Sequence, residues 1–274
     1  MSFEKFNLKL PFPDLFPSSW KEIFDGFSSY DFMAFRNLEH FKHEVSMISQ
    51  REDDKCGIYY KDALKKLMRG ESDFEENEQE SIRNLVRSNL HKRGLITEEV
   101  YESFKYTTDG TQVGVDVGKY VSGEPDCVIT PNRQYIDFFY ELYISISYPY
   151  HITNEDVKEN VAKLLATVEE LERQHIFIKI VLVLPIRNVK TDGGSFFSAI
   201  PLFSHKDSKS VSVMSSVINE RLLRKFYFAV LENLYKKELQ YGYGMPVIMQ
   251  SCMNIGNKFE EVEFFESVVK HVGA

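Results

Sequence analysis

Three kinds of side chain in this sequence could hold a metal ion or take part in catalysis: carboxylates, histidines and cysteines. Glu124 and Asp126 precede a strand-like segment that contains Glu141, and carboxylates on adjacent strands can hold magnesium for phosphodiester hydrolysis. A nuclease of this kind carries a lysine two residues after the second acid, where this chain has Tyr143. A divalent-metal nuclease is therefore an alternative hypothesis, while turn-forming roles for Asp116 and Asp126 are the main interpretation.

The histidines and cysteines form no recognisable motif. Cys56, Cys127 and Cys252 are widely spaced, which indicates neither a metal site nor a disulfide framework, so a reducing compartment is expected. His40 and His43 have a spacing that can bind zinc on a helix, but no third ligand is suggested nearby. No serine lies in a nucleophile elbow. We therefore predict no catalytic residue, no cofactor and no metal.

Composition excludes several classes of protein. Hydrophobic residues make up 43% of the chain and aromatic residues 14%, which is enough for a packed core. The net charge of −8 argues against a uniformly basic nucleic-acid surface and is compatible with a basic protein partner. The sequence shows neither a signal peptide nor a run of about 20 apolar residues. We expect a soluble cytoplasmic protein without a membrane partner.

Residues 1–105 are expected to form a mainly helical region without a strong strand. Helices are predicted near residues 20–27, 29–43, 58–68 and 78–93. The last of these helices carries Arg83, Arg87 and His91 on one face. These side chains could bind phosphate, although cations are also usual in the C-terminal half of a surface helix.

A strand–helix–strand crossover is predicted between Tyr135 and Val189. Residues 136–147 alternate in polarity as a strand does, and residues 157–171 carry apolar side chains at helical spacing. Thr153 and Asp156 form a weak capping box before this helix. Residues 176–184 are almost continuously apolar, as in a buried strand. The crossover predicts an α/β fold, with residues 106–274 forming a three-layer Rossmann-like sandwich.

Shorter elements are expected on both sides of the crossover. The valines and glycines that follow Thr107 predict short strands and tight turns. After the crossover, the patterns predict a hairpin of strands 196–203 and 209–214, a helix over 218–239, a strand over 246–250 and a helix over 258–272.

In such a sheet the usual binding site is the crevice at the C-terminal ends of the strands. The first strand of the crossover ends at Ser145 and Ser147, and the turn Tyr148–Asn154 follows. A nucleotide site needs a glycine-rich turn so that phosphate can approach the helix, and this turn contains no glycine. Nucleotide binding is therefore not expected at this position.

The von Willebrand factor A type of sandwich binds a divalent cation at this position through Asp-x-Ser-x-Ser. Here Ser145 stands where the aspartate would fall and Pro149 where the second serine would fall, so that metal site would be degenerate. Three segments, GVDVGKYVSGEPDCVI (114–129), INERLLRKFYF (218–228) and YGYGMPV (241–247), resemble a family of uncharacterised bacteriophage proteins. The resemblance implies a von Willebrand A-like sandwich after a helical region, a phage origin and expression in a bacterial cytoplasm. It implies no activity.

Three groups of residues are predicted to form a contact surface. The members are Tyr148, His151 and Thr153 in the turn, Arg221, Arg224 and Lys225 on the second long helix, and Tyr241 and Tyr243 in a glycine turn. The basic residues and tyrosines would also be the best nucleic-acid surface. We predict a non-catalytic bacteriophage interaction protein whose partner is another protein, of the phage, of the host or of the host's defence machinery. An RNA- or DNA-binding module is the alternative, and neither the partner's identity nor the oligomeric state follows from the sequence.

Overall fold

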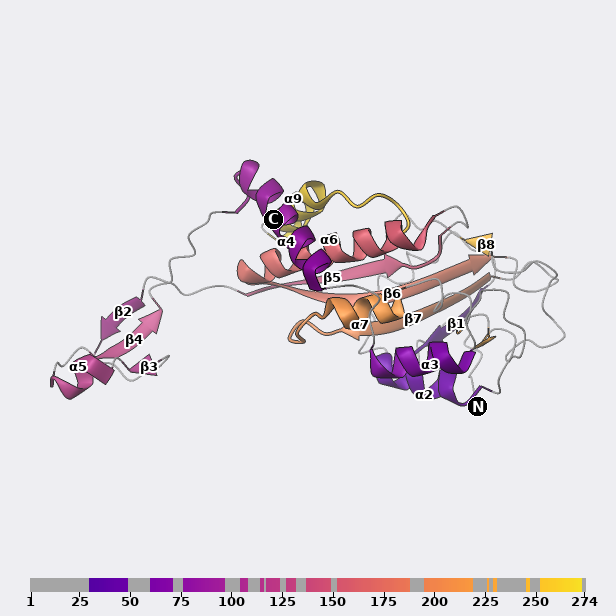
Figure 1. The fold of residues 1–274 in the computed structure, drawn as a ribbon, viewed down its shortest axis with the longest axis horizontal. Helices are drawn as coiled ribbons and strands as arrows, with labels where there is room; N and C mark the ends of the chain where they lie inside the picture. Colours follow the sequence, from indigo (N-terminus) through magenta and orange to yellow (C-terminus); the bar gives the residue numbers. More distant parts are fainter. Residues whose placement is uncertain are drawn as a thin grey trace.

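The computed structural model describes residues 30–48, 60–70, 76–96, 104–107, 114–115, 117–123, 127–131, 137–148, 152–187, 195–218, 226, 229–230, 245–246 and 252–272. This part of the chain contains a six-stranded mixed sheet with packed helices, and a small three-stranded sheet that lies apart from it (Figure 1). The α/β class predicted from the sequence is confirmed.

The main sheet mixes parallel and antiparallel neighbours. Its order is β1 (Tyr30–Ala34), β7 (Ser195–Phe203), β6 (Ile176–Arg187), β5 (Phe138–Ser145) and β9 (Met253–Asn254), and β8 (Met245–Pro246) also pairs with β6. The β1–β7, β5–β6 and β5–β9 pairs are parallel, whereas β6 runs antiparallel to β7 and β8.

The predicted crossover is confirmed as β5, α6 (Asn154–Arg173) and β6. Helix α6 begins in a capping box, because the Thr153 hydroxyl accepts from the Asp156 amide at 3.1 Å and the Asp156 carboxylate accepts from the Thr153 amide at 3.2 Å. Strands β5 and β6 then pair in parallel over the full length of β5. Local sequence signals are sufficient for this unit.

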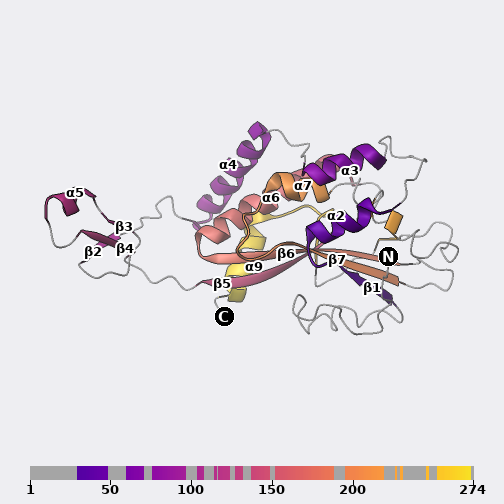
Figure 2. The ribbon, with the colours of Figure 1, turned by 90° about the horizontal axis from the view of Figure 1, so that it is seen from below.

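The described helices of the main body lie on one side of the sheet. They are α2 (Leu38–Ser46), α3 (Tyr60–Arg69), α4 (Glu76–Lys92), α6, α7 (Val211–Val217) and α9 (Glu261–Val272). Figure 2 shows α2, α3, α4, α6 and α7 together above the sheet, and α9 packs against α4, α6 and β5. Even-numbered residues such as Leu142, Ile180 and Leu182 join the buried core with these helices. The odd-numbered residues of β5 and β6 therefore face the opposite side of the sheet.

Two predicted elements were wrong. The helix expected over residues 29–43 is strand β1 followed by α2, which begins after Asn37, whose side chain accepts from the His40 amide at 2.9 Å. Residues 30–34 pair in parallel with β7, so a long-range partner overrides their local helical pattern. The strand expected over 209–214 is instead helix α7, which the Ser210 side chain caps.

The remaining predicted elements lie where the sequence placed them or outside the described residues. Helices α3, α4 and α9 match the predictions over residues 58–68, 78–93 and 258–272. The helix near residues 20–27 and most of the helix over 218–239 lie outside the described residues. For the strand expected over residues 246–250, the structure describes β8 only.

Of the short strands in the small sheet, β3 (Gly114–Val115) and β4 (Val128–Pro131) confirm the strands predicted after Thr107, whereas β2 (Phe104–Thr107) precedes that segment. Strands β2, β4 and β3 pair antiparallel in that order, and the short helix α5 (Val117–Val121) follows β3. In the main body, β1 pairs with β7 and α4 packs on α6, so elements from before residue 105 contact elements from after it. The division into residues 1–105 and 106–274 stays a prediction about independent units.

Candidate functional site

The face of the sheet opposite the described helices carries a group of charged and aromatic side chains. They lie near the N-terminal ends of β5 and β6 and just after β7. We call this group the cross-strand strip, and its members are Asp137, Phe139, Glu141, Tyr143, His175, Phe177, Lys179 and His205. The alternation of a β-strand places these odd-numbered residues of β5 and β6 on one face.

Two cross-strand pairs join β5 and β6, and a third pair joins the residues that immediately precede these strands. Asp137 Oδ1 lies 3.2 Å from His175 Nδ1, at the start of the two strands. The rings of Phe139 and Phe177 follow, with centroids 6.0 Å apart and planes at 30°. Next, Lys179 Nζ donates to Glu141 Oε1 at 2.8 Å. Such pairs stabilise the register of the two strands, each by a fraction of a kcal/mol to about 1 kcal/mol.

The two aromatic rings at the centre of the strip differ in exposure, because Phe177 is half-buried and Phe139 is exposed. Phe139 is 56% exposed and pairs with Phe177 of β6, whereas β9 pairs with β5 only at Ile144 and Ser145. The neighbouring Lys179 side chain is only 13% exposed. The strip therefore presents one large apolar side chain on a rigid element, with charged side chains around it.

Glu141 is held as a carboxylate within the strip. Burial opposes its ionisation, but hydrogen bonds from Lys179 and Tyr143 outweigh burial and lower the pKa of Glu141 below its usual value. The Tyr143 hydroxyl donates to Glu141 Oε2, and Lys179 donates to Oε1. Because both oxygens of Glu141 accept from protein groups, this carboxylate is poorly placed to act as a base or as a metal ligand.

His205 comes from the segment after β7 and closes one side of the strip. Its ring meets the Phe139 ring edge-on, with centroids 5.1 Å apart and planes at 71°. Burial is the main cause that lowers the pKa of His205, and the charges of Glu141 and Lys179 act on it in opposite directions. In the described part of the chain, its Nε2 atom is buried without a hydrogen-bond partner.

The C-terminal end of β5, where a crevice was expected, is instead closed by the segment between β9 and α9. Ser145 and Ser147 are buried there, and Asn254 Nδ2 donates to the Ser147 carbonyl at 3.0 Å. The Gly256 amide donates to Asn254 Oδ1 at 2.9 Å. The Gly256 backbone is so close to Tyr148 that an added Cβ would lie 2.5 Å from the Tyr148 Cβ.

Asn160 of α6 completes this closure. Its Nδ2 donates to the carbonyls of Ile255 and Asn257, both at 2.8 Å, and its Oδ1 accepts from the Phe259 amide at 3.1 Å. Buried backbone groups need such partners, and one amide side chain supplies all three here. The closure leaves the serine oxygens at this end of β5 buried within the protein.

The structure describes two of the eight predicted contact residues. Tyr148 is only 8% exposed, and Thr153 is exposed at the start of α6. The others, His151, Arg221, Arg224, Lys225, Tyr241 and Tyr243, lie outside the described residues, as do Glu124 and Asp126 of the nuclease hypothesis. The predicted contact surface stays a prediction.

Sequence reasoning missed the strip as a unit. The alternation of Asp137, Phe139 and Glu141 is visible in the sequence, but their partners on β6 follow only from the parallel register. No sequence pattern signalled His205, because its contact with Phe139 depends on where β7 ends in the folded sheet.

The cations expected on α4 bind a neighbouring helix. Arg83 Nε lies 2.9 Å from Glu169 Oε2, and Arg87 Nε lies 2.9 Å from Glu170 Oε1, both across the α4–α6 contact. Glu170 is buried, and burial raises its pKa although Arg173 and Arg87 oppose this shift. The arginine pattern thus marks a helix-packing surface. Within the described residues, no group of three His, Cys, Asp or Glu side chains could hold a metal ion.

The described residues define an α/β protein in which helices pack against one face of a mixed sheet, and part of the other face carries paired charged and aromatic side chains. The chain belongs to the family described as Domain of unknown function (DUF7192), which matches residues 7–267. Comparisons with curated proteins and with solved structures gave no match. Among the described helices, none has the length and apolar character needed to cross a membrane.

Proposed function

We propose that this protein is a non-catalytic interaction protein that binds another protein through the cross-strand strip. The observation that carries the proposal is Phe139, which is 56% exposed on a strand that pairs with β6 and lies between two charged pairs. Protein interfaces are commonly anchored by a few aromatic side chains within a polar rim. A paired strand holds Phe139 in place before binding, so little ordering entropy is lost when a partner covers it.

The chemistry of the strip favours binding over catalysis. A general base needs a carboxylate that can take a proton, whereas Glu141 accepts hydrogen bonds from Lys179 and Tyr143 and has a lowered pKa. Lys179 is tied to the same carboxylate and is mostly buried. These groups are better suited to fixing the geometry around Phe139 than to reacting with a substrate.

The setting of this interaction is part of the proposal. The resemblance to bacteriophage proteins supports a phage origin, a bacterial cytoplasm and a partner from the host or its defence machinery. It also supports a von Willebrand A-like sandwich as the finer fold. The chain's net charge of −8 favours a partner with a basic surface, because complementary charge speeds association.

Affinity capture with matched variants tests the proposal. Phe139→Ala removes the proposed anchor, and Tyr120→Ala removes a 68%-exposed aromatic side chain on α5, outside the strip. We expect a captured protein that is lost with Phe139→Ala and kept with Tyr120→Ala. With that protein purified, calorimetry should show binding at least about tenfold weaker for Phe139→Ala. A partner retained equally by both variants would contradict the proposal, provided that both keep the wild-type circular dichroism spectrum.

Nucleic-acid binding is a second candidate, because exposed aromatic rings on a sheet face can stack bases. The Phe139–Phe177 pair has this form, but Asp137 and Glu141 beside it would repel phosphates. Polarisation measurements with random-sequence oligonucleotides at low salt decide between the two. Binding that weakens with salt and is lost in Phe139→Ala would favour nucleic acid.

The metal-dependent nuclease is the third hypothesis, and its described member is Glu141. Incubation of the purified protein with DNA and RNA in the presence of magnesium or manganese tests it. Cleavage that Glu141→Gln abolishes would favour this hypothesis over a binding function, and no cleavage would remove it.

A further inference from the structure

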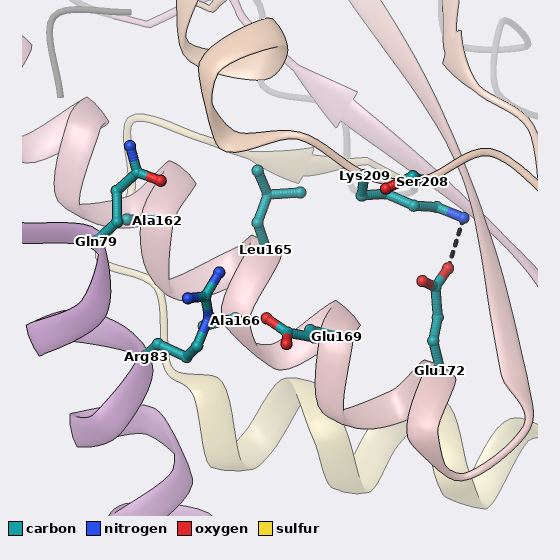
Figure 3. A pocket seen from close by; sticks show the side chains of 9 residues that line it. All are labelled: Gln79, Arg83, Ala162, Leu165, Ala166, Glu169, Glu172, Ser208 and Lys209. Atoms are coloured by element: carbon teal, nitrogen blue, oxygen red, sulfur yellow. Dashed lines mark hydrogen bonds and ion pairs between the residues drawn. The ribbon is translucent and has the colours of Figure 1, made fainter. Parts of the chain in front are cut away.

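A groove of about 320 Å³ lies on the helix-packed side of the sheet, between α4, α6 and the segment before α7 (Figure 3). Ala162, Leu165 and Ala166 of α6 form its apolar floor. Gln79 and Arg83 line it from α4, and Ser208 and Lys209 line it from the segment before α7. Its volume is at the lower end of the range of roughly 300–1,000 Å³ that is usual for small-molecule sites.

Two pairs of opposite charges border this floor. On the α4 side, Arg83 Nε binds Glu169 at 2.9 Å, and Arg83 Nη1 binds Glu80 at 2.9 Å. On the other side, Lys209 contacts Glu172 and also donates to the His205 carbonyl at 3.1 Å. Figure 3 shows Glu169 and Glu172 one turn apart on α6, with Arg83 and Lys209 reaching toward them from different elements.

The two pairs differ in how firmly they are held. The Lys209 side chain is only 4% exposed, so its charge stays fixed beside Glu172. The Arg83 side chain is 35% exposed and the Glu169 side chain 38% exposed. Such a pair contributes at most about 1 kcal/mol to stability. Glu169 Oε1 also accepts from Arg173 Nη2 at 2.9 Å, so a ligand reaches Glu169 by displacing or sharing the Arg83 contact at Oε2, which costs little. In the described part of the chain, no hydrogen bond involves Arg83 Nη2.

We propose that this groove binds a small zwitterion of the α-amino acid type with an apolar side chain. The ligand's carboxylate accepts from the Arg83 guanidinium, its ammonium group donates to the carboxylates of Glu169 and Glu172, and its side chain covers the floor formed by Ala162, Leu165 and Ala166. The lining charges of Arg83, Lys209, Glu169 and Glu172 sum to zero. A site of this composition repels neither half of a zwitterion, whereas it offers a phosphate or a polyamine as much repulsion as attraction.

Derivatives of one amino acid test the ligand class. The full-length protein is titrated by calorimetry with L-leucine, N-acetyl-L-leucine, L-leucinamide and inorganic phosphate. We expect L-leucine to bind, and each derivative that lacks one charge to bind about tenfold more weakly or not at all, because a hydrogen bond to a charged group is lost. Equal affinity for L-leucine and N-acetyl-L-leucine, or no binding at millimolar L-leucine, overturns the proposal.

Two arginines on α4 provide a matched pair of variants for locating the site. Arg83→Gln and Arg87→Gln each remove an ion pair between α4 and α6, but only Arg83 lines the groove. We expect about tenfold weaker L-leucine binding for Arg83→Gln and affinity near wild type for Arg87→Gln. Equal losses in the two variants would mean that helix packing, not ligand contact, sets the affinity, and would overturn the proposal.

A third variant keeps the test decisive if Arg83→Gln fails to fold. Ser208→Phe narrows the groove at an exposed position and removes no ion pair. It should abolish L-leucine binding while the thermal unfolding midpoint stays near that of the wild type, and unchanged binding would count against the groove. The groove contains no member of the cross-strand strip, so Phe139→Ala should still bind L-leucine whether or not the proposed function holds.

Discussion

The two ends of strand β5 use polar side chains for opposite purposes. At its N-terminal end, Asp137, Phe139 and Glu141 pair with His175, Phe177 and Lys179 on the face opposite the described helices, and Phe139 stays more than half exposed. At its C-terminal end, Ser145 and Ser147 are buried beneath the segment after β9. One end therefore leaves an aromatic side chain exposed among charged pairs, and the other end closes the core.

This difference separates the groups that stabilise the fold from those of the proposed binding surface along a single strand. Hydrogen bonds of the C-terminal end satisfy buried backbone groups, and a missing partner there leaves a desolvated group unpaired. The pairs of the N-terminal end lie partly in solvent, where each adds little to stability. Changes at the C-terminal end should therefore unfold the protein, while changes at the N-terminal end should spare it.

The largest effect is expected for Asn160→Ala. This change leaves two carbonyls and one amide of residues 255–259 without their partner, so the free energy of unfolding should fall by roughly 3–4 kcal/mol. Urea unfolding followed by circular dichroism measures it, with Asn84→Ala on the exposed surface of α4 as the control. If both variants lose less than about 1 kcal/mol, the hydrogen bonds of Asn160 to residues 255–259 contribute little to stability.

Gly256→Ala should be the next most damaging change. The new Cβ would lie 2.5 Å from the Tyr148 Cβ, which forces the backbone apart and should cost about 2–3 kcal/mol. Gly94→Ala is the comparison, because no atom lies within 4 Å of its Cβ and only its positive φ of 69° is unfavourable, at about 1–2 kcal/mol. Equal destabilisation of the two variants would show that the close approach to Tyr148 is relieved without cost.

At the other end of β5, Lys179→Met should cost about 1 kcal/mol at neutral pH, because Glu141 keeps its hydrogen bond from Tyr143. The lowered pKa of Glu141 means that its contribution is present above the unfolded-state value of about 4.3 and is lost as pH falls below it. Unfolding measured from pH 3 to 7 should show a smaller acid-dependent loss for Lys179→Met than for the wild type.

The exposed pair Lys65–Asp62 supplies the control for this change. Lys65→Met should alter the free energy of unfolding by less than about 0.5 kcal/mol at every pH, as is usual for surface ion pairs. A loss from Lys179→Met as large as that from Asn160→Ala would break the distinction between the two ends of β5.

The smallest effect on stability is expected from His205, and it depends on pH. Its pKa is lowered in the folded protein by burial, so protons bind the unfolded chain first as pH falls below about 6.5. The free energy of unfolding should therefore decrease between pH 7 and pH 5, and less so in His205→Phe, which keeps an aromatic ring beside Phe139. His91→Gln, at an exposed position of α4, is the control. An identical pH slope in wild type and His205→Phe would show that His205 is not responsible.

Local sequence patterns determined the elements of the crossover. Thr153 and Asp156 are three residues apart and form the capping box, and the apolar spacing of α6 and the apolar run of β6 are equally local. Helices α3, α4 and α9 follow from the same helical spacing. These signals need no knowledge of which elements become neighbours, so the sequence alone was sufficient for the α/β class.

Only the tertiary structure determined the features that depend on residues distant in the sequence. Residues 30–34 form a strand because β7, more than 160 residues later in the sequence, supplies the hydrogen-bond partners of that strand. Asn160 closes the end of β5 only because residues 255–259 lie over it, and the surroundings of the exposed Phe139 ring form only once β6 and His205 flank it. Hydrogen bonding and burial at these positions are set by neighbours that sequence periodicity does not identify.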